Sequence, residues 1–130
     1  METRKHFRKR DAILSCVRST DVHPSADWVF DQVRKEIPDI SLATVYRNLA
    51  LFKQQGLIAS VATVRGVERF DSNTDPHVHF ICQNCDAVID LPQLSVPHSL
   101  SAQAAHHIGG TVDVCQLSFT GICYHCCQNH

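Results

Sequence analysis

SLATVYRNLALFKQQG, residues 41–56, predicts one helix whose two ends are both marked in the sequence. Ser41 can cap the first turn, because its hydroxyl accepts hydrogen bonds from backbone N–H groups that the turn leaves unpaired, and Gly56 suits the left-handed position after the last turn. Apolar residues at helical spacing form the stripe that we expect to face the core: Leu42, Val45 and Leu49. The opposite face carries short and hydrogen-bonding side chains that suit a DNA groove: Ala43, Thr44, Tyr46, Arg47 and Asn48.

The segments on either side of this helix predict the rest of a winged helix-turn-helix. Downstream, residues 57–63 and 67–71 read as two short strands around Arg65-Gly66, a hairpin wing whose tip makes Arg65 a further candidate for DNA contact. Upstream, residues 10–18 carry apolar positions at helical spacing, and Ser25 can cap a second helix. The alternative is an ordinary helical packing unit without a DNA-binding role.

Charge divides the 130 residues into two unlike parts. Residues 1–69 contain all 12 Lys and Arg against eight Asp and Glu, a formal charge of +4, whereas residues 70–130 contain five Asp and no Lys or Arg, a charge of −5. The second part also holds six of the seven Cys and seven of the nine His. A basic helix-turn-helix half predicts double-stranded DNA as the partner, and the acidic half predicts metal binding. A charge split that only serves solvation is the alternative.

Two Cys-x-x-Cys pairs lie in the acidic part, with 37 residues between them: Cys82 with Cys85, and Cys123 with Cys126. Four thiolates at this spacing complete a tetrahedral Zn²⁺ site without an open position, which is typical of structural zinc. A redox dithiol is the alternative, and it requires a thioredoxin-like β-α-β context. Residues 1–7 contain no apolar run and no segment reaches membrane-spanning length, so we expect a cytoplasmic protein with reduced thiols and no membrane partner.

The acidic part also predicts a small sheet with one helix. Residues 78–81, 87–91 and the long alternating stretch 111–120 read as strands, and residues 100–107 read as a helix that Gly109-Gly110 ends. A single helix leaves apolar residues of the long strand uncovered, so we infer a homodimer that buries this sheet against its twin. A dimer would also present two reading helices to a two-fold operator.

These elements predict an α+β protein with two domains. Residues 1–70 form the N-terminal winged helix-turn-helix DNA-binding domain, and residues 77–130 form a small C-terminal α/β domain for metal binding and dimerisation. Residues 71–76 are the expected hinge between them.

Five motifs in this order resemble the ferric uptake regulator family, and the resemblance covers nearly the whole chain. They are His-Pro-Ser-Ala-Asp at 23–27, Ala-Thr-Val-Tyr-Arg-Asn-Leu at 43–49, Arg-Phe-Asp at 69–71, His-x-His-x-x-Cys-x-x-Cys at 77–85 and Cys-x-x-Cys at 123–126. The resemblance implies a dimeric, metal-dependent repressor that binds an AT-rich inverted repeat. It implies structural zinc on the four cysteines named above. It also implies a regulatory site for Fe²⁺ or Mn²⁺ at the hinge, formed by His23, Asp71, His77, His79 and Asp90.

Two short carboxylates favour the peroxide-sensing branch of that family. Iron-uptake regulators usually carry Glu at the positions of Asp71 and Asp90, whereas peroxide-sensing repressors typically carry Asp at both. The resemblance then implies that bound Fe²⁺ reacts with peroxide, that His23 or His77 is oxidised, and that DNA is released. Mn²⁺ would support repression without that chemistry.

Three alternatives to a peroxide-sensing repressor remain open at this point. The first is an iron- or manganese-responsive repressor without peroxide sensing, and the second is a zinc-stabilised interaction module without a DNA-binding role. The third is a metalloenzyme that uses the His and Asp site. No general acid, nucleophile or phosphate-binding Gly loop accompanies the ligands, so we do not expect an enzyme.

Overall fold

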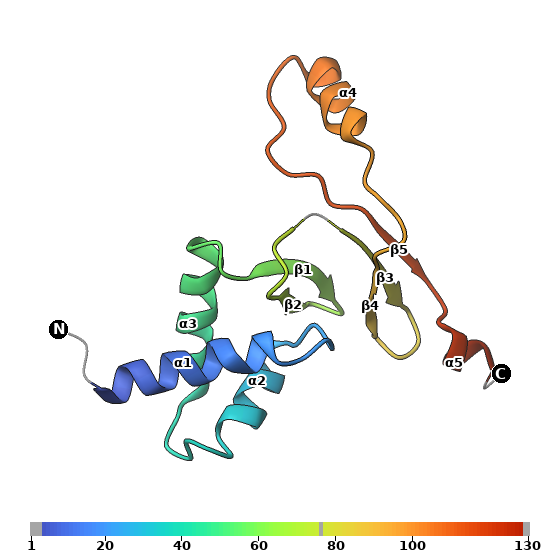
Figure 1. The fold of residues 1–130 in the computed structure, drawn as a ribbon. Helices are drawn as coiled ribbons and strands as arrows, with labels where there is room; N and C mark the ends of the chain where they lie inside the picture. The colour runs from blue at the N-terminus through green and yellow to red at the C-terminus, as the bar shows by residue number, and fades with distance from the viewer. Residues whose placement is uncertain (1–3, 76, 129–130) are drawn as a thin grey trace. The chain divides into compact units, whose positions relative to one another are not determined.

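The computed structural model describes residues 4–75 and 77–128, and it divides the chain into two units, Met1–Thr74 and Asp75–His130 (Figure 1). Both parts of the expected α+β fold are present, with a winged helix in the first unit and a small α/β unit after it. Pro76, the last residue of the expected hinge, lies outside the described residues. Within the described ranges, no helix has the length and apolar character needed to cross a membrane.

Three helices build the first unit: α1 (Arg4–Arg18), α2 (Ala26–Val33) and α3 (Leu42–Gln54). The Ser25 hydroxyl caps α2 by accepting from the Trp28 N–H at 3.2 Å, and the Ser41 hydroxyl caps α3 by accepting from the Thr44 N–H at 3.1 Å. Gly56 follows Gln55, the C-cap residue of α3, and has a φ of 76°, the left-handed conformation that this position favours. The predicted caps are thus confirmed. The helix expected over residues 10–18 begins six residues earlier than predicted, at Arg4.

The apolar stripe of α3 lies one turn further along the helix than predicted. Val45 and Leu49 are buried as expected, but Leu42 is 36% exposed, and Phe52 is fully buried. Leu42 opens the helix, at the end of the stripe, so the packed part of α3 runs from Val45 to Phe52. The buried cluster of the unit joins these positions to α1 through Ile13 and Val17 and to α2 through Val29 and Val33.

The wing is an antiparallel pair of strands, β1 (Ala59–Val64) and β2 (Val67–Asp71). Its turn residues Arg65 and Gly66 have φ values of 52° and 80°, as expected of a two-residue hairpin turn whose twist matches the flanking strands. The pairing register shifts between Ser60 and Ala62, which marks a bulge in β1. An ion pair of 2.9 Å between Lys53 Nζ and Glu68 Oε2 ties the end of α3 to β2.

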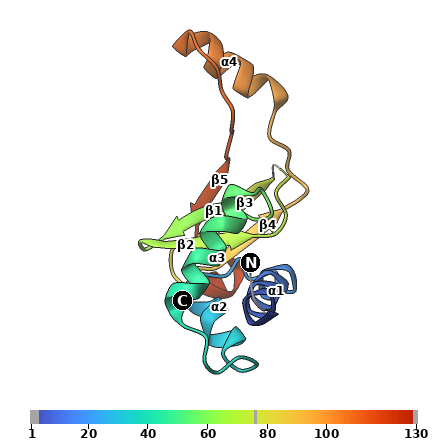
Figure 2. The same cartoon turned by 90° about the vertical axis from the view of Figure 1, so that its left-hand side faces the viewer.

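The second unit is a three-stranded sheet with two helices: β3 (Val78–Cys82), β4 (Val88–Leu91), α4 (His98–Ile108), β5 (Ser118–Gly121) and α5 (Tyr124–Gln128). The strand order is β4-β3-β5, and the central strand β3 pairs antiparallel with β4 and parallel with β5. Gly109 ends α4 in the left-handed conformation, as predicted. No side chain of α4 is buried, and in two perpendicular views α4 lies apart from the sheet (Figures 1 and 2).

The prediction of a long strand over residues 111–120 is wrong for its first seven residues. Only Ser118–Gly121 is a strand, because β3 begins at Val78 and its parallel pairing runs from His79–Ser118 to Cys82–Gly121. Residues 111–117 have no strand assignment in the described part of the chain, and Val114 is 71% exposed. Alternation of apolar and polar residues indicates a segment that can form a strand, but a strand also requires a neighbouring strand with which its backbone can form hydrogen bonds.

Candidate functional site

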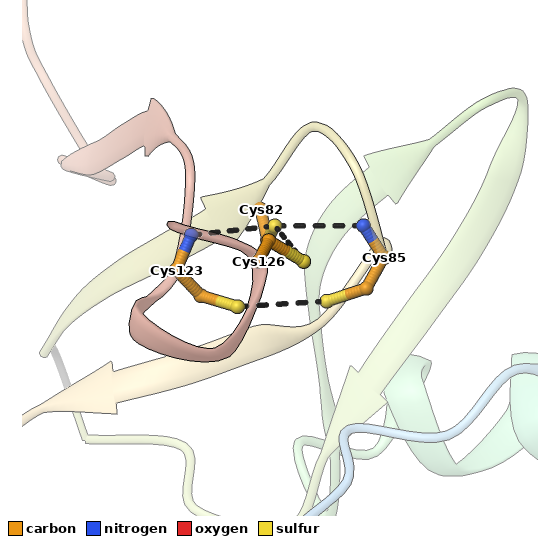
Figure 3. A group of neighbouring side chains, drawn as sticks. All are labelled: Cys82, Cys85, Cys123 and Cys126. Atoms are coloured by element: carbon orange, nitrogen blue, oxygen red, sulfur yellow. Dashed lines mark hydrogen bonds between the residues drawn. The ribbon is translucent and has the colours of Figure 1, made fainter. Parts of the chain in front are cut away.

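The parallel pairing of β5 with β3 brings the two Cys pairs of the sequence together. Cys82 ends β3 opposite Gly121, the last residue of β5, and the Gln83 N–H donates to the Gly121 carbonyl at 2.8 Å. The chain therefore leaves β5 beside the turn that contains Cys85, and Cys123 and Cys126 follow within a few residues. Figure 3 shows the four side chains pointing toward one another.

The sulfur positions fit a tetrahedral Zn²⁺ ion. Cys82 Sγ and Cys126 Sγ are 3.7 Å apart, Cys85 Sγ and Cys123 Sγ are 3.8 Å apart, and all four sulfurs lie within 4.8 Å of one another. Zn–S bonds of about 2.3 Å in a tetrahedron place the sulfurs about 3.8 Å from each other. The first pair lies at the end of β3 and in the turn before β4, and no strand follows α5 in the described residues, so neither pair lies in a β-α-β unit of the kind that a redox dithiol requires.

Backbone hydrogen bonds prepare one of these sulfurs to be a thiolate. Cys82 Sγ accepts from the N–H of Cys85 at 3.5 Å and from the N–H of Cys123 at 3.4 Å (Figure 3). These two bonds are the main causes that lower the pKa of Cys82 to about 6, against the opposing effect of burial. At Cys126 a contact with Asn84 lowers the pKa, but burial and the neighbouring thiols outweigh it and raise the pKa to about 12. Four thiols without a cation cannot all ionise, and a bound divalent ion would supply the missing positive charge.

A second group of donors forms where β3 begins. His77 and His79 are two residues apart, and Asp90 of β4 lies directly opposite His79 in the antiparallel register. Both Nε2 atoms approach the same carboxylate oxygen, Asp90 Oδ1, at 3.0 Å. The His77 Nδ1 donates to the Asp75 carbonyl at 2.6 Å, which leaves its Nε2 available as a ligand.

The first unit carries a smaller group of the same chemistry. His23 Nε2 lies 3.2 Å from Asp71 Oδ2, and the His23 side chain is buried. The other carboxylate oxygen, Asp71 Oδ1, accepts from the Asn73 N–H at 2.9 Å, which fixes the direction in which the carboxylate faces. His23 has a φ of 55°, an uncommon conformation for a residue with a Cβ atom.

Imidazole nitrogens and carboxylate oxygens form a donor set that suits Fe²⁺ or Mn²⁺. A six-coordinate ion with bonds of about 2.1 Å places neighbouring ligand atoms about 3.0 Å apart, which fits the distances around Asp90. The second unit offers three such donors and the first unit offers two. Neither group alone fills the five or six positions of such an ion.

The residues predicted to read DNA are accessible on α3 and at the tip of the wing. Tyr46 is 53% exposed, Ala43, Arg47 and Arg65 are exposed, and Thr44 and Asn48 are half-buried. The Arg47 guanidinium donates to Thr44 Oγ1 at 3.2 Å, and the Asn48 amide donates to the Thr44 carbonyl at 2.8 Å. These bonds within α3 leave the remaining guanidinium donors of Arg47 pointing to solvent or to a partner.

Residues 2–120 match the ferric uptake regulator family. The chain belongs to this family. It is 35% identical to the peroxide operon regulator of Bacillus subtilis (strain 168) over 126 residues, covering 94% of this chain and 85% of that protein. It is 33% identical to the peroxide-responsive repressor PerR of Staphylococcus aureus (strain USA300) over 125 residues, covering 91% and 79% of the two chains.

Solved structures agree with this assignment to the ferric uptake regulator family. The Campylobacter jejuni peroxide stress regulator superposes with a TM-score of 0.75 at 27% identity, covering 94% of this chain and 91% of that one. The family resemblance read from the sequence is thus confirmed, including its likeness to peroxide regulators. Membership in a family of transcription regulators also favours a regulator over the metalloenzyme alternative.

One residue with contacts to the loop that carries His23 was not singled out by sequence reasoning. Arg69 lies within the Arg-Phe-Asp motif, but its guanidinium donates to the carbonyl oxygens of Val22 and His23, 47 and 46 residues away. The signal in the sequence was its position two residues before Asp71, because residues i and i+2 of a strand share a face.

Proposed function

We propose that this ferric uptake regulator family protein is a homodimeric, metal-dependent repressor that binds double-stranded DNA and releases it in response to peroxide. The observation that carries the proposal is the pair of donor groups, two on the first unit and three on the second, that together supply five ligands of one chemistry. Likeness to peroxide regulators over nearly the whole chain supports the same function.

The proposed regulatory ion, Fe²⁺ or Mn²⁺, takes all five donors: His23, Asp71, His77, His79 and Asp90. Only five residues separate Asp71 from His77, so the chain between the two groups spans at most about 20 Å. An ion that uses both groups therefore holds the DNA-binding unit to the second unit. Binding the ion and binding DNA are then coupled, because both favour the same arrangement of the units.

The structural Zn²⁺ of this proposal is held by Cys82, Cys85, Cys123 and Cys126. Its role is to fix α5 and the end of β5 to the end of β3, within one unit. A closed tetrahedral site has no position for peroxide or substrate, so this ion serves the fold. The sulfur spacings near 3.8 Å support the assignment.

Peroxide sensing is the finer part of the proposal. Fe²⁺ held by the five donors would supply the electron that cleaves the O–O bond of peroxide, and the oxygen species released beside the ligands would add to an imidazole; Mn²⁺ would not supply that electron. The residues proposed to be oxidised are His23 and His77, each of which presents Nε2 within 3.2 Å of a ligand carboxylate. An imidazole that has gained an oxygen would be a poorer ligand, so the ion would no longer hold the two donor groups together and the affinity for DNA would fall. Asp rather than Glu at positions 71 and 90 supports this branch.

The proposed partners are a second copy of the chain and an AT-rich inverted repeat. No side chain of α4 is buried, and Leu100, Ile108 and Val114 are 40%, 67% and 71% exposed in the single chain. Apolar exposure on this scale supports an interface between copies. Each copy would then offer one α3 and one wing, with Ala43, Thr44, Tyr46, Arg47, Asn48 and Arg65 toward DNA.

The test compares DNA binding by the Fe²⁺ and Mn²⁺ forms before and after brief exposure to peroxide, with mass spectrometry of the histidine peptides. We expect both forms to bind promoter DNA, only the Fe²⁺ form to release it, and an added oxygen on His23 or His77. A Fe²⁺ form that keeps its DNA with unmodified histidines would establish the second candidate, an iron- or manganese-responsive repressor without peroxide sensing. Metal-independent DNA binding would contradict both.

A further inference from the structure

Three consecutive carbonyl oxygens of the loop that carries His23 are bound by two consecutive residues of β2. The Arg69 guanidinium donates from Nε to the His23 carbonyl, and from its second terminal nitrogen to the Val22 carbonyl at 2.6 Å. The backbone N–H of Phe70 donates to the Pro24 carbonyl at 2.9 Å. All of these groups belong to the first unit.

The alternation of β2 explains why one strand can both hold this loop and ligate a metal. Phe70 is 4% exposed and joins the core of the unit, so its two neighbours, Arg69 and Asp71, project to the opposite face of the strand. Arg69 there contacts the backbone of residues 22 and 23, and Asp71 contacts the His23 imidazole. The bulge of β1 lies across from Arg69 and Phe70, where bulges commonly redirect side chains beside a functional site.

His23 needs such support because of its backbone conformation. Its φ of 55° is in the left-handed region, which residues with a Cβ atom adopt rarely and keep only where the surroundings hold them. The forked guanidinium of Arg69 can donate to two adjacent carbonyls at once, which a lysine ammonium on a flexible stem does less well. An arginine at position 69 is therefore well suited to stabilise this loop conformation.

We propose that Arg69 is a positioning residue for the regulatory metal. By holding the carbonyls of Val22 and His23, it keeps the His23 imidazole directed at Asp71 before an ion binds. Without it, the loop relaxes from the left-handed conformation, and the ion must order His23 at the expense of affinity. The inference rests on the proposed role of His23 as a ligand, and it adds that the ligand is preorganised by an arginine that does not touch the ion.

The experiment measures Mn²⁺ affinity of the zinc-loaded protein, and the ligand-field spectrum of Co²⁺ bound at the same site. We expect Arg69→Met to weaken Mn²⁺ binding by about 10- to 100-fold, the usual loss when a partner that orients a ligand is removed. The Co²⁺ spectrum should change and the zinc content should not. Arg69→Lys, which keeps the charge but not the fork, should recover part of the loss and decides the question if Arg69→Met does not fold.

A readout without any regulatory ion tests the loop itself. In the zinc-loaded protein without Mn²⁺, Fe²⁺ or Co²⁺, amide hydrogen exchange at Phe70 should be faster in Arg69→Met than in the wild type, because its acceptor, the Pro24 carbonyl, is no longer held in place. The matched control is Arg34→Met, an exposed arginine of the same unit that pairs with Asp31 and contacts none of these groups. It should leave the affinity, the spectrum and the exchange rate unchanged.

His23→Ala separates the failure of this inference from the failure of the proposed function. If His23→Ala weakens Mn²⁺ binding while both Arg69 variants bind Mn²⁺ and Co²⁺ as the wild type does, then Arg69 has no positioning role and the five-donor site stands. If His23→Ala itself leaves Mn²⁺ affinity unchanged, then the five-donor site is wrong, and a positioning role of Arg69 in it is wrong as well.

Discussion

The two units of this protein are stabilised by different means. Of the seventeen buried apolar side chains among the described residues, thirteen belong to the first unit and four to the second. Two of those four, Cys82 and Cys126, are proposed zinc ligands. A small unit that cannot bury enough apolar surface commonly relies on a metal site for its folding free energy. We infer that an apolar core stabilises the DNA-binding unit and that zinc replaces much of such a core in the other.

Loss of zinc should have the largest effect and should be confined to the second unit. We expect Cys82→Ser and Cys123→Ser to abolish zinc binding and dimerisation, because structural zinc sites contribute on the order of 10 kcal/mol to folding. Zinc analysis, sedimentation and amide hydrogen exchange of both units measure this. Cys127→Ser is the matched control, since Cys127 is exposed and its thiol donates to the Ile122 carbonyl at 3.7 Å. A zinc-free dimer that stays folded would show that the second unit has a sufficient core after all.

The contrast between the units also explains which features could be predicted from the sequence. Ser25, Ser41, Gly56 and Gly109 were predicted correctly because caps depend on neighbours within a few residues. The Cys spacing likewise indicates a zinc site without reference to the fold. Such signals are local, and they are independent of how the units pack.

Features that depend on distant partners were not predictable from the residues alone. The stretch 111–117 has strand-like alternation, but its register with β3 begins only at Ser118, and a single bond of 3.3 Å from the His79 N–H reaches the Leu117 carbonyl before that. The contacts of Arg69 with the His23 loop cross 46 residues and follow from the alternation of β2 around a buried Phe70. The grouping of the proposed His and Asp ligands came from the family resemblance, because a lone His or Asp carries no such signal.

Removing core volume from the first unit should have the next largest effect, and it should spare the metal sites. Phe52 is fully buried in α3, and we expect Phe52→Ala to lower the free energy of unfolding by about 3 to 5 kcal/mol. Denaturant titration of the zinc-loaded protein measures this loss, and zinc content should stay at the wild-type value. Leu51→Ala, which truncates a neighbouring side chain that is 39% exposed, is the control and should cost less than about 1 kcal/mol. Loss of zinc from the Phe52→Ala variant would contradict the inference that the two units are stabilised separately, the first by its apolar core and the second by zinc.

A substitution among the residues of α3 that are predicted to contact DNA should weaken DNA binding but leave the stability of both units unchanged. We expect Arg47→Ala to weaken operator binding by about 1 to 3 kcal/mol if Arg47 contacts a base edge. If it contacts a phosphate, affinity should fall for all sequences alike and the salt dependence should flatten by about one charge. Titration of operator and unrelated DNA at several salt concentrations distinguishes these cases. Arg34→Ala removes an exposed arginine from α2 as the control, and equal effects of both variants would place the reading surface elsewhere.

Asp90→Glu should have the smallest effect on stability and affinity, and it tests the link between the units most directly. The substitution keeps the charge and the ligand type but moves the carboxylate outward by roughly one C–C bond, about 1.5 Å. Asp90 Oδ1 lies 3.0 Å from the Nε2 atoms of both His77 and His79, so this shift changes the geometry around a shared ion while both units stay folded.

In the peroxide-sensing reading, Asp90→Glu should still bind Mn²⁺, Fe²⁺ and operator DNA, but its Fe²⁺ form should keep DNA after peroxide and gain less oxygen on His23 and His77. Asp113→Glu makes the same change at an exposed aspartate in residues 111–117 and should respond to peroxide as the wild type does. If the Asp90→Glu variant releases DNA after peroxide as readily as the wild type does, then the length of the side chain at position 90 does not govern peroxide sensing. The choice of aspartate at position 90 would then carry no information about the branch of the family, and the case for peroxide sensing would rest on histidine oxidation in the wild-type protein.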